Sequence, residues 1–439
     1  MTRPPVFVLG AGFAGLTAAV ELQRLGLDVT VLEARDSIGG LATSHHLGGV
    51  QYDTGAHFVT NRLATAVGVM DQCDDAERYG EAVWSRGRSA SYPFGLMRSP
   101  RFAGSALLTR VQPRPSVRTA ADRFRADYGR ALADEVAIPL IEAWSGLPAD
   151  ELAASVADKI PGGIAQTIAL TVARRLTRRA VAIGYCGEAP QSANVWHVYP
   201  RAGLDVVTQH LAEQLVGKIR LQSPVEAINI EGPRVDGMRV VGVRVNGCDH
   251  EASAVISTLP ASVLARLVDH PAVAPVADLR FRAMVFVQLH LNGRGLLPQP
   301  VTWIPDRAQP FFRVTEAPMS MPWFAPPGET VLTVDFGAEV GDAIWTADDS
   351  LLAAQALDGL ADLVPDIRAR FIGVTSTRTP IAYPVYALRT EPARLAIATH
   401  GISGLVSAGR NGEFAHLLME DVYWRTLRIT RALGRYEAG

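Results

Sequence analysis

The chain has 439 residues, of which 48% are apolar, enough for two or three packed domains. Its formal net charge is −2, so its overall charge gives no attraction to nucleic acid or to an anionic membrane. The three cysteines are far apart and lack C-x-x-C spacing, so we expect neither a disulfide framework nor a metal site. We expect a cytoplasmic protein, because the residues before the first predicted strand are too few for a signal peptide and no apolar run reaches the ~20 residues of a membrane span.

A glycine-rich turn follows the first predicted strand. Gly10, Gly12 and Gly15 have the spacing G-x-G-x-x-G, and helix formers come directly after them. This order predicts a strand, a tight turn and a helix whose N-terminal end binds a pyrophosphate. The second predicted strand, Asp28–Leu32, ends at Glu33, whose carboxylate can accept hydrogen bonds from ribose hydroxyls. An acid at this place argues against a bound 2′-phosphate.

A second pair of glycines, Gly39 and Gly40, comes soon after Glu33 and Arg35. FAD extends beyond its pyrophosphate with a ribityl chain and a three-ring head, so a second stretch without side chains suits FAD better than NAD. The pattern Glu-x-Arg-x-x-x-Gly-Gly resembles flavoenzymes of the amine oxidase and protoporphyrinogen oxidase superfamily. Those proteins usually carry Arg where this chain has Leu41.

The segments between these motifs predict further elements in chain order. We expect mixed, mainly helical structure over 61–88 and an extended entry at Tyr92-Pro93-Phe94 into a cap. Periodic apolar residues predict one helix from Thr119 to Leu147 and another from Ile164 to Ile183. The second helix carries four arginines on one side. A solvated arginine face is the interpretation we prefer there, and contact with a membrane surface is the alternative.

The later part of the chain is richer in predicted strands. A helix over Leu204–Val216 precedes a hairpin that turns at Asn246-Gly247, and a buried strand follows at Ala254–Pro260. Beyond it we expect a mixed domain with one helix, Ser350–Leu363. The strands of that domain are predicted at Phe281–Leu291, Val301–Ile304, Phe311–Val314 and Thr330–Phe336.

The order of these motifs is most similar to the UDP-galactopyranose mutase-like branch of the superfamily. The resemblance implies an α/β fold with a Rossmann-like FAD-binding domain of the GR2 type, a discontinuous mixed-sheet substrate domain and a helical cap. The FAD-binding domain would comprise residues 1–60, 190–262 and 396–439, the cap 90–189 and the substrate domain 263–395. The implied cofactor contacts are Gly10, Gly12, Ala14, Gly15, Glu33, Arg35, Gly40, Leu41, His57, Val225, Gly409, Arg410, Met419 and Glu420.

Five of these implied contacts come from the second half of the chain. Val225 would pair its backbone with the adenine. Gly409-Arg410, followed by Met419 and Glu420 at the start of the last helix, resembles the flavin motif of the mutase-like branch, although Glu420 stands where an aspartate is usual. A helix N-terminus there would offer N–H groups to the flavin, and Arg410 would reach ribityl or phosphate oxygens.

The candidate catalytic residues are His57, Arg282, Arg313 and Tyr383. His57 follows the sequence Asp-x-Gly-x, a position that the resemblance brings beside the flavin ring, and imidazole titrates near neutral pH. Arg282 and Arg313 resemble the positions from which mutases hold a substrate diphosphate, although each also suits a salt-bridged strand residue. Tyr383 would be one of several aromatic side chains that line the site, although packing in the hydrophobic core would explain it equally well.

These residues leave three functions open. The preferred one is an FAD-dependent oxidoreductase that moves a hydride from a small organic substrate to flavin N5. The alternatives are a non-redox sugar-nucleotide mutase and a non-catalytic flavin-binding protein. The expected partner is a small molecule, either anionic or a sugar nucleotide, rather than nucleic acid, and the sequence does not predict an oligomeric state.

Overall fold

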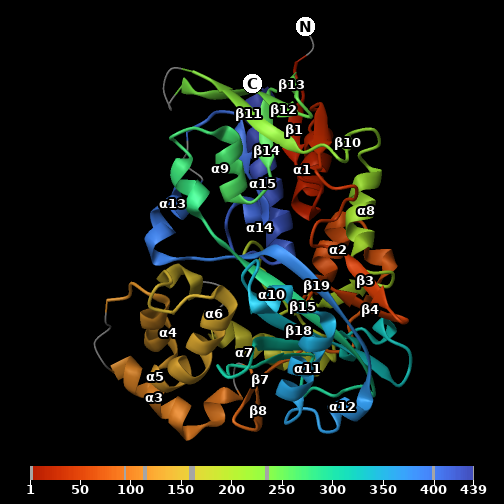
Figure 1. Cartoon of the computed structure of the whole chain (residues 1–439), viewed down its shortest axis with the longest axis vertical. Coiled ribbons are helices and arrows are strands. Elements are labelled where there is room, and N and C mark those ends of the chain that lie inside the picture. The colour runs from red at the N-terminus through yellow and green to blue at the C-terminus, as the bar shows by residue number, and fades with distance from the viewer. Residues whose placement is uncertain are drawn as a thin grey trace.

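The computed structural model describes residues 3–92, 95–111, 116–157, 164–232, 237–397 and 401–438. One part of the molecule, at the top of Figure 1, is built on a parallel sheet, and a larger mixed sheet with helices beside it forms the lower part. The extended entry expected at Pro93-Phe94 lies outside the described residues.

The parallel sheet has β1 (Val6–Leu9) at its centre. All four residues of β1 are buried, because strands flank it on both sides and other elements cover both faces. This accounts for its unbroken apolar sequence. The five strands lie in the order β10 (Ile219–Arg220), β2 (Val29–Leu32), β1, β14 (Ala254–Ser257) and β20 (Leu405–Ser407).

Different elements cover the two faces of the parallel sheet. Val6 and Val8 face a layer of helices, whereas Phe7 and Leu9 face a small antiparallel sheet and a helix. The first layer consists of α1 (Phe13–Arg24), α2 (Asn61–Val67), α8 (Asp205–Glu213) and α15 (Met419–Ala438). The second consists of β11 (Val225–Glu231), β12 (Arg239–Val245), β13 (Cys248–Glu251) and α9 (Ala261–Val268). The hairpin turn predicted at Asn246-Gly247 joins β12 to β13.

The lower sheet has seven strands. Helix α11 (Asp349–Leu360) covers one face, and Met284, Phe286 and Phe312 on the other face pack toward the cap. The four strands predicted for this domain are present with slightly different bounds. The strand order is β19 (Phe371–Pro384), β15 (Phe281–Asn292), β18 (Glu329–Ala338), β17 (Phe311–Glu316), β16 (Val301–Trp303), β7 (Glu81–Ser85) and β8 (Arg88–Ser91).

The cap contains several shorter helices where one long helix was expected. The chain from Thr119 to Leu147 breaks at Gly129, which has φ +80°, and a Cβ there would lie 2.6 Å from the backbone nitrogen of Ala106. The neighbouring helix passes so close that only glycine fits. The cap helices are α3 (Pro100–Val111), α4 (Ala120–Tyr128), α5 (Arg130–Leu132), α6 (Ile138–Ser145) and α7 (Ile164–Thr177), with a π-helical turn over Ala133–Ala137.

The mainly helical structure expected over 61–88 is wrong beyond α2. Apart from one 3-10 turn, strands β6 (Cys73–Asp75) and β7 follow α2, and β7 and β8 form a hairpin at one edge of the lower sheet. Arg86 and Gly87 both have positive φ and make the tight turn of this hairpin. An Arg-Gly turn is a weaker sequence signal than Asn-Gly, so the hairpin was missed.

Small elements connect the two large sheets. One is the hairpin of β3 (Ser44–Leu47) and β4 (Val50–Asp53), and the other is a three-stranded sheet of β5 (Val59–Thr60), β9 (His197–Pro200) and β6. The remaining short helices are α10 (Ala343–Thr346), α12 (Ile367–Arg370), α13 (Glu391–Ala396) and α14 (Gly409–Gly412).

Candidate active site

The first glycine turn lies at the carboxyl end of β1, where α1 begins. Gly15 allows α1 to pack directly on the turn, because a Cβ at Gly15 would stand 1.9 Å from the carbonyl oxygen of Gly10. Gly12 precedes the first residue of α1, and within the described part of the chain no side chain caps this helix end. The turn therefore presents helix N–H groups with no side chain in front of them.

The second glycine pair lies directly against the first turn. Gly39 donates its backbone N–H to the carbonyl oxygen of Ala11 at 2.9 Å, and Gly12 and Gly39 form a parallel bridge. A Cβ on Gly40 would lie 3.3 Å from the Cα of Gly12. The two segments singled out in the sequence are thus one continuous surface of backbone, with half-buried Leu41 following it.

Glu33 lies at the end of β2, as expected. Its carboxylate accepts hydrogen bonds from the backbone nitrogens of Ala11 at 2.8 Å and Arg35 at 2.9 Å, which fixes its orientation beside the turn. The segment before Val225 runs alongside, since Ser223 donates its backbone N–H to the carbonyl oxygen of Glu33 at 2.8 Å. The fold therefore brings Val225 near the strand end that carries Glu33.

The C-terminal motif joins the same surface. Strand β20 leads to Gly409, which has φ +80°, and a Cβ there would lie 2.7 Å from the Cβ of Ala14 in the first turn of α1. Arg410 follows, and its Nε donates to the carbonyl oxygen of Leu417 at 2.9 Å. Residues near the two ends of the chain thus meet where α1 begins.

The carboxylate of Glu420 accepts hydrogen bonds from neighbouring side chains. It is only 1% exposed, and it accepts hydrogen bonds from Thr60 Oγ1 at 2.9 Å and Arg62 Nε at 2.5 Å. Met419 is half-buried and packs against the core of the upper part. Glu420 therefore ties α15 to the start of α2, which explains an acid at this position without a cofactor contact.

His57 lies in the loop between β4 and β5. Its Nδ1 is buried, makes no hydrogen bond among the described residues and lies 3.8 Å from Oδ2 of Asp53, while 22% of the side chain is exposed. Burial, together with the positive charges of Arg410 and Arg313, lowers the pKa of His57 to about 3. The imidazole is therefore neutral at physiological pH.

Asp53, the last residue of β4, is the acid beside His57. It accepts hydrogen bonds from the hydroxyls of Ser44 and Tyr199, each at 2.5 Å. Burial raises the pKa of Asp53 to about 7, against the lowering effect of these two hydrogen bonds, and nearby Asp205 adds to the rise. Asp53 was part of the motif that pointed to His57, but we did not predict a role for it.

Tyr383 lies where the three parts of the molecule meet. Its ring lies 4.9 Å from that of Trp144 in the cap, and its hydroxyl lies 3.4 Å from a terminal nitrogen of Arg313 in the lower sheet. The guanidinium carbon of Arg410, from the upper part, lies 5.7 Å from the Tyr383 ring centre. His57, Arg313, Tyr383 and Arg410, which are far apart in the sequence, are thus brought together.

Arg313 is firmly paired within the lower sheet. Its Nε donates to Oδ2 of Asp335 at 2.8 Å, a terminal nitrogen contacts the same oxygen, and Asp335 is fully buried. Burial alone would lower the pKa of Arg313, but contacts with Asp335 and Tyr383 raise it above its ordinary value. The charge of Arg313 is therefore retained and largely balanced by Asp335.

Arg282 has different surroundings. It donates to Glu339 at 2.5 Å, and the Cβ positions of Gly146 and Gly337 lie within 3.0 Å of its guanidinium atoms. Gly146 ends cap helix α6, so Arg282 fastens the cap to the lower sheet. Glu339 also pairs with Arg280 at 3.3 Å, so of the two arginines expected to share one diphosphate only Arg313 has a carboxylate to itself.

Sequence reasoning overlooked Asp335 and Trp144, which complete this cluster. Asp335 is a charged residue within an otherwise apolar strand, Val334-Asp335-Phe336, and such a residue needs a buried partner. Trp144 was one of the periodic apolar residues that predicted a helix from Thr119 to Leu147. Only the packing of the cap on the lower sheet brings it to Tyr383.

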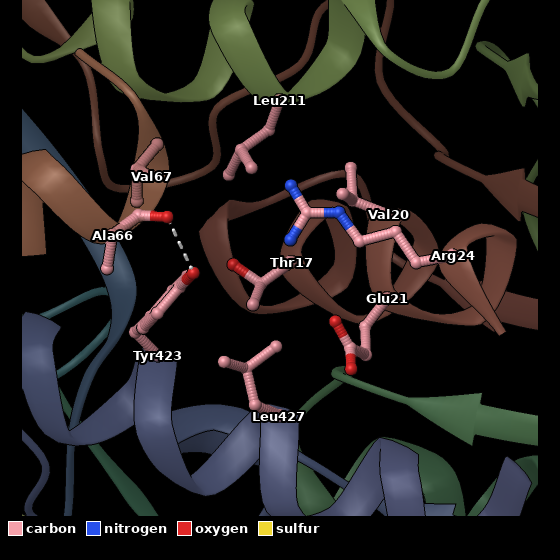
Figure 2. A pocket seen from close by; sticks show the side chains of 9 residues that line it. All are labelled: Thr17, Val20, Glu21, Arg24, Ala66, Val67, Leu211, Tyr423 and Leu427. Carbon is pink, nitrogen blue, oxygen red and sulfur yellow. Dashed lines mark hydrogen bonds between the residues drawn. The ribbon is translucent and has the colours of Figure 1, made fainter.

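A small cavity in the upper part does not belong to this site. It lies among α1, α2, α8 and α15, and Figure 2 shows Thr17, Tyr423 and the other side chains that line it. The Tyr423 hydroxyl donates to the carbonyl oxygen of Ala66 at 3.1 Å, and the cavity has room for about one water molecule. It is a packing gap.

Neither a metal centre nor a membrane-spanning helix is found among the described residues. No group of three His, Cys, Asp or Glu side chains within them is placed to hold a metal ion. None of the helices within them combines the length and the hydropathy that crossing a bilayer requires.

The family model for flavin-containing amine oxidoreductases matches residues 13–423, nearly the whole chain. The chain belongs to this family. The resemblance inferred from the glycine motifs is confirmed, and membership of this flavin-containing family implies FAD as the cofactor.

Curated relatives match only part of this chain. A putative flavin-containing monoamine oxidase of Mycobacterium tuberculosis is 38% identical over 102 residues, which is 21% of this chain and 22% of that protein. Human all-trans-retinol 13,14-reductase is 33% identical over 94 residues, or 21% of this chain and 14% of that protein. The matched part thus spans about a fifth or less of these relatives.

Solved structures match over almost the full length at low identity. A reduced UDP-galactopyranose mutase has a TM-score of 0.78 and 19% identity, covering 99% of this chain and 96% of its own. A putative protoporphyrinogen oxidase from Exiguobacterium has a TM-score of 0.73 and 18% identity, covering 99% and 100%. Cyclohexylamine oxidase from Brevibacterium oxydans has a TM-score of 0.71 and 14% identity, covering 100% of each chain. These likenesses confirm the predicted FAD-binding fold.

The site described above fits FAD. The backbone surface formed by Gly12, Gly39 and Gly40 beside the uncapped end of α1 suits a pyrophosphate. Glu33, at the end of the next strand, suits hydrogen bonds from the hydroxyls of a ribose. The buried Nδ1 of His57 lacks a hydrogen-bond partner within the described residues. Arg410 has no carboxylate paired with it there, so its charge is available to an anionic cofactor.

Proposed function

We propose that the enzyme oxidises a C–H bond next to an amine or hydroxyl group of a small, largely apolar organic substrate. The observation that carries this proposal is a neutral histidine, His57, close to Arg313 and Arg410, in a site whose sheet face carries aromatic side chains. Bound FAD would supply the acceptor for the two electrons of the substrate. The protein's own residues would then only bind, orient and move one proton.

His57 is the proton acceptor in this proposal. Its low pKa keeps the imidazole unprotonated at physiological pH, so it can accept a hydrogen bond from the substrate amine or hydroxyl. It would take the proton only as loss of hydride from the neighbouring carbon makes that group strongly acidic. We assign this step to Nε2, because Nδ1 is enclosed on the side of Asp53. Asp53, held by Ser44 and Tyr199, is the positioning residue that would fix the ring.

We infer an apolar substrate because the arginines of the site already have other partners. Arg313 is bound by Asp335, and we assign Arg410 to the cofactor as expected from the sequence. Of the candidate arginines only Arg282 would then remain for an anionic substrate, and a single arginine that already donates to Glu339 is a poor site for a diphosphate. Phe286, Trp303 and Tyr383 cluster on this side of the lower sheet with Trp144 from the cap, and such a set suits an apolar molecule.

The test is anaerobic mixing of the FAD-loaded protein with primary amines and the matching alcohols, benzylamine and benzyl alcohol among them. We expect loss of the oxidised flavin absorbance with at least one of them, and peroxide or another reduced acceptor when an oxidant is added. Conversion of UDP-galactopyranose by the dithionite-reduced protein, with no amine or alcohol bleaching the flavin, would overturn the proposal in favour of the mutase alternative. Neither activity in FAD-loaded protein would favour a non-catalytic flavoprotein.

A further inference from the structure

Helix α7 exposes its apolar side. Ile168, Val172 and Leu176 follow one another at four-residue intervals and are 48%, 49% and 79% exposed. The opposite side faces the protein: Leu170 is 6% exposed, and Arg174 donates to the backbone oxygen of Tyr79 at 3.2 Å. A helix on a protein surface normally does the reverse and buries its apolar stripe.

Helix α3 in the same cap shows the same inversion. Leu107, Leu108 and Val111 are 65%, 61% and 76% exposed, and α3 has no buried residue. Nine of the seventeen large apolar side chains that are exposed among the described residues lie between Tyr92 and Leu176. Exposed apolar residues scattered singly need no explanation, but a row of them along one side of a helix, as on α7, favours an interaction surface.

Helices α3 and α7 themselves carry charges of one sign, although Glu135 elsewhere in the cap pairs with Arg101 of α3 at 2.5 Å. The sequence has no Asp or Glu from Ala82 to Ala121 and none from Lys159 to Gly187, although both stretches are rich in arginine. Arg175, Arg178 and Arg179 are exposed beside the apolar stripe of α7, and Arg110 is exposed on α3. The rest of the chain must carry the compensating acids, because the net charge is only −2.

From this combination we infer that α3 and α7 form a docking face for the surface of an anionic lipid bilayer. Apolar side chains would enter the interface between headgroups and acyl chains, and the flanking arginines would contact lipid phosphates and carboxylates. A second copy of the chain is a poorer occupant, because a symmetric contact through α7 would bring two rows of arginine together without acids from this segment. Both helices lie in the lower half of Figure 1, whereas the parallel sheet lies in the upper half.

This inference revises the interpretation preferred from the sequence. There, the arginine side of the 164–183 helix was taken as an ordinary solvated face. The structure shows that solvent also reaches the apolar side of α7, so a solvated arginine face alone does not account for this helix. The inference does not depend on the proposed reaction, because lipid binding is measured without turnover.

The experiment is sedimentation of the FAD-loaded protein with sucrose-filled vesicles of phosphatidylcholine alone or mixed with phosphatidylserine. We expect binding to the mixed vesicles and little to the neutral ones. The variant Ile168→Ser/Val172→Ser/Leu176→Ser should bind about tenfold more weakly or worse, because burial of apolar side chains at the interface is lost. The variant Arg175→Gln/Arg178→Gln should weaken binding about tenfold and reduce its sensitivity to salt.

The matched control is Val216→Ser/Val340→Ser, which removes two equally exposed apolar side chains outside the cap. It should bind like the unaltered protein, and flavin content and far-UV circular dichroism should show that all variants fold. The α3 variant Leu107→Ser/Leu108→Ser tests the second helix separately, and unaltered binding in that variant would remove α3 from the face.

Three results would overturn the inference as a whole. One is a lack of binding to both kinds of vesicle. Another is equal binding to both with no effect of the arginine changes. The third is self-association in analytical ultracentrifugation that the α7 variant abolishes, which would make a second copy the occupant.

Discussion

One half of the site is formed by backbone atoms and the other by side chains. On the side of the parallel sheet, the surface around Gly12, Gly39 and Gly409 is made of backbone, and it depends on the absence of side chains. On the side of the lower sheet, Arg313 with Asp335 and the aromatic rings form the surface with buried side chains. The first half is therefore sensitive to added volume, and the second to changes of charge and protonation.

The largest effect is expected when a side chain is added at a glycine of the backbone surface. Gly15→Val should prevent folding, because its Cβ would lie 1.9 Å from the carbonyl oxygen of Gly10. Gly12→Val should fold and lose FAD, since the nearest atoms to a Cβ there are 3.9 Å away but the side chain would occupy the space of the pyrophosphate. Circular dichroism and flavin content distinguish the two outcomes. A Gly12→Val variant that retains its full flavin would contradict the assignment of the turn.

The second prediction compares His57 with His197. Burial lowers the pKa of both to about 3, but His197 is fully buried, with the rings of Tyr79 and Tyr185 4.4 and 4.7 Å away. We expect His57→Ala to keep its flavin and lose roughly 10²- to 10⁴-fold in the rate of flavin reduction, as for loss of a general base. His197→Phe should change stability and leave that rate unaltered. Equal rates in both variants would mean that a low pKa at His57 reflects burial alone.

The third prediction compares two paired arginines. Arg313→Gln should lower the free energy of unfolding by about 3–5 kcal/mol, because it leaves fully buried Asp335 without its partner. Arg282→Gln should cost about 1 kcal/mol through its ion pair, because the side chain of Glu339 is 44% exposed and stays hydrated. Urea denaturation measures both values. Adding Asp335→Asn to Arg313→Gln should recover part of the loss, and no recovery would indicate that packing is the main cause.

The same contrast explains what the sequence could predict. The backbone half of the site was predictable because glycine at fixed spacing has few other uses, and the segments at Gly12 and Gly40 do lie in contact. The lower sheet was predicted only where its strands are apolar. Strand β19, which carries Tyr383 at the centre of the site, was missed because its middle, Thr375–Arg378, is polar and half-exposed.

Side-chain partners were less predictable than elements. The sequence pointed to Arg282 and Arg313 as a pair, but it could not show that Glu339 and Asp335 hold them separately. Glu420 likewise matched a motif, yet its partners come from residues about 360 positions away. Such pairings depend on tertiary packing, which no local pattern encodes.

The last prediction concerns the acid that connects the two halves, Asp53. Its pKa is about 7 in the folded protein and near 3.8 in an unfolded chain, so between these values the folded state holds a proton that the unfolded state releases. The contribution of Asp53 to the free energy of unfolding therefore falls as the pH rises through this window, by at most about 4 kcal/mol, and is constant above it. His57, which faces Asp53, contributes with the opposite sign, because its lowered pKa makes stability rise between about pH 3 and its ordinary value of 6.5.

Comparison of the unaltered protein with Asp53→Asn isolates the contribution of Asp53, since the histidines are present in both. Urea denaturation across this pH range should show that the difference between the two proteins shifts in favour of the variant as the pH rises toward 7. A difference that does not change with pH would mean that Asp53 is ionised throughout this range. The carboxylate would then position His57 by charge, and the loss of flavin reduction in Asp53→Asn would approach that of His57→Ala.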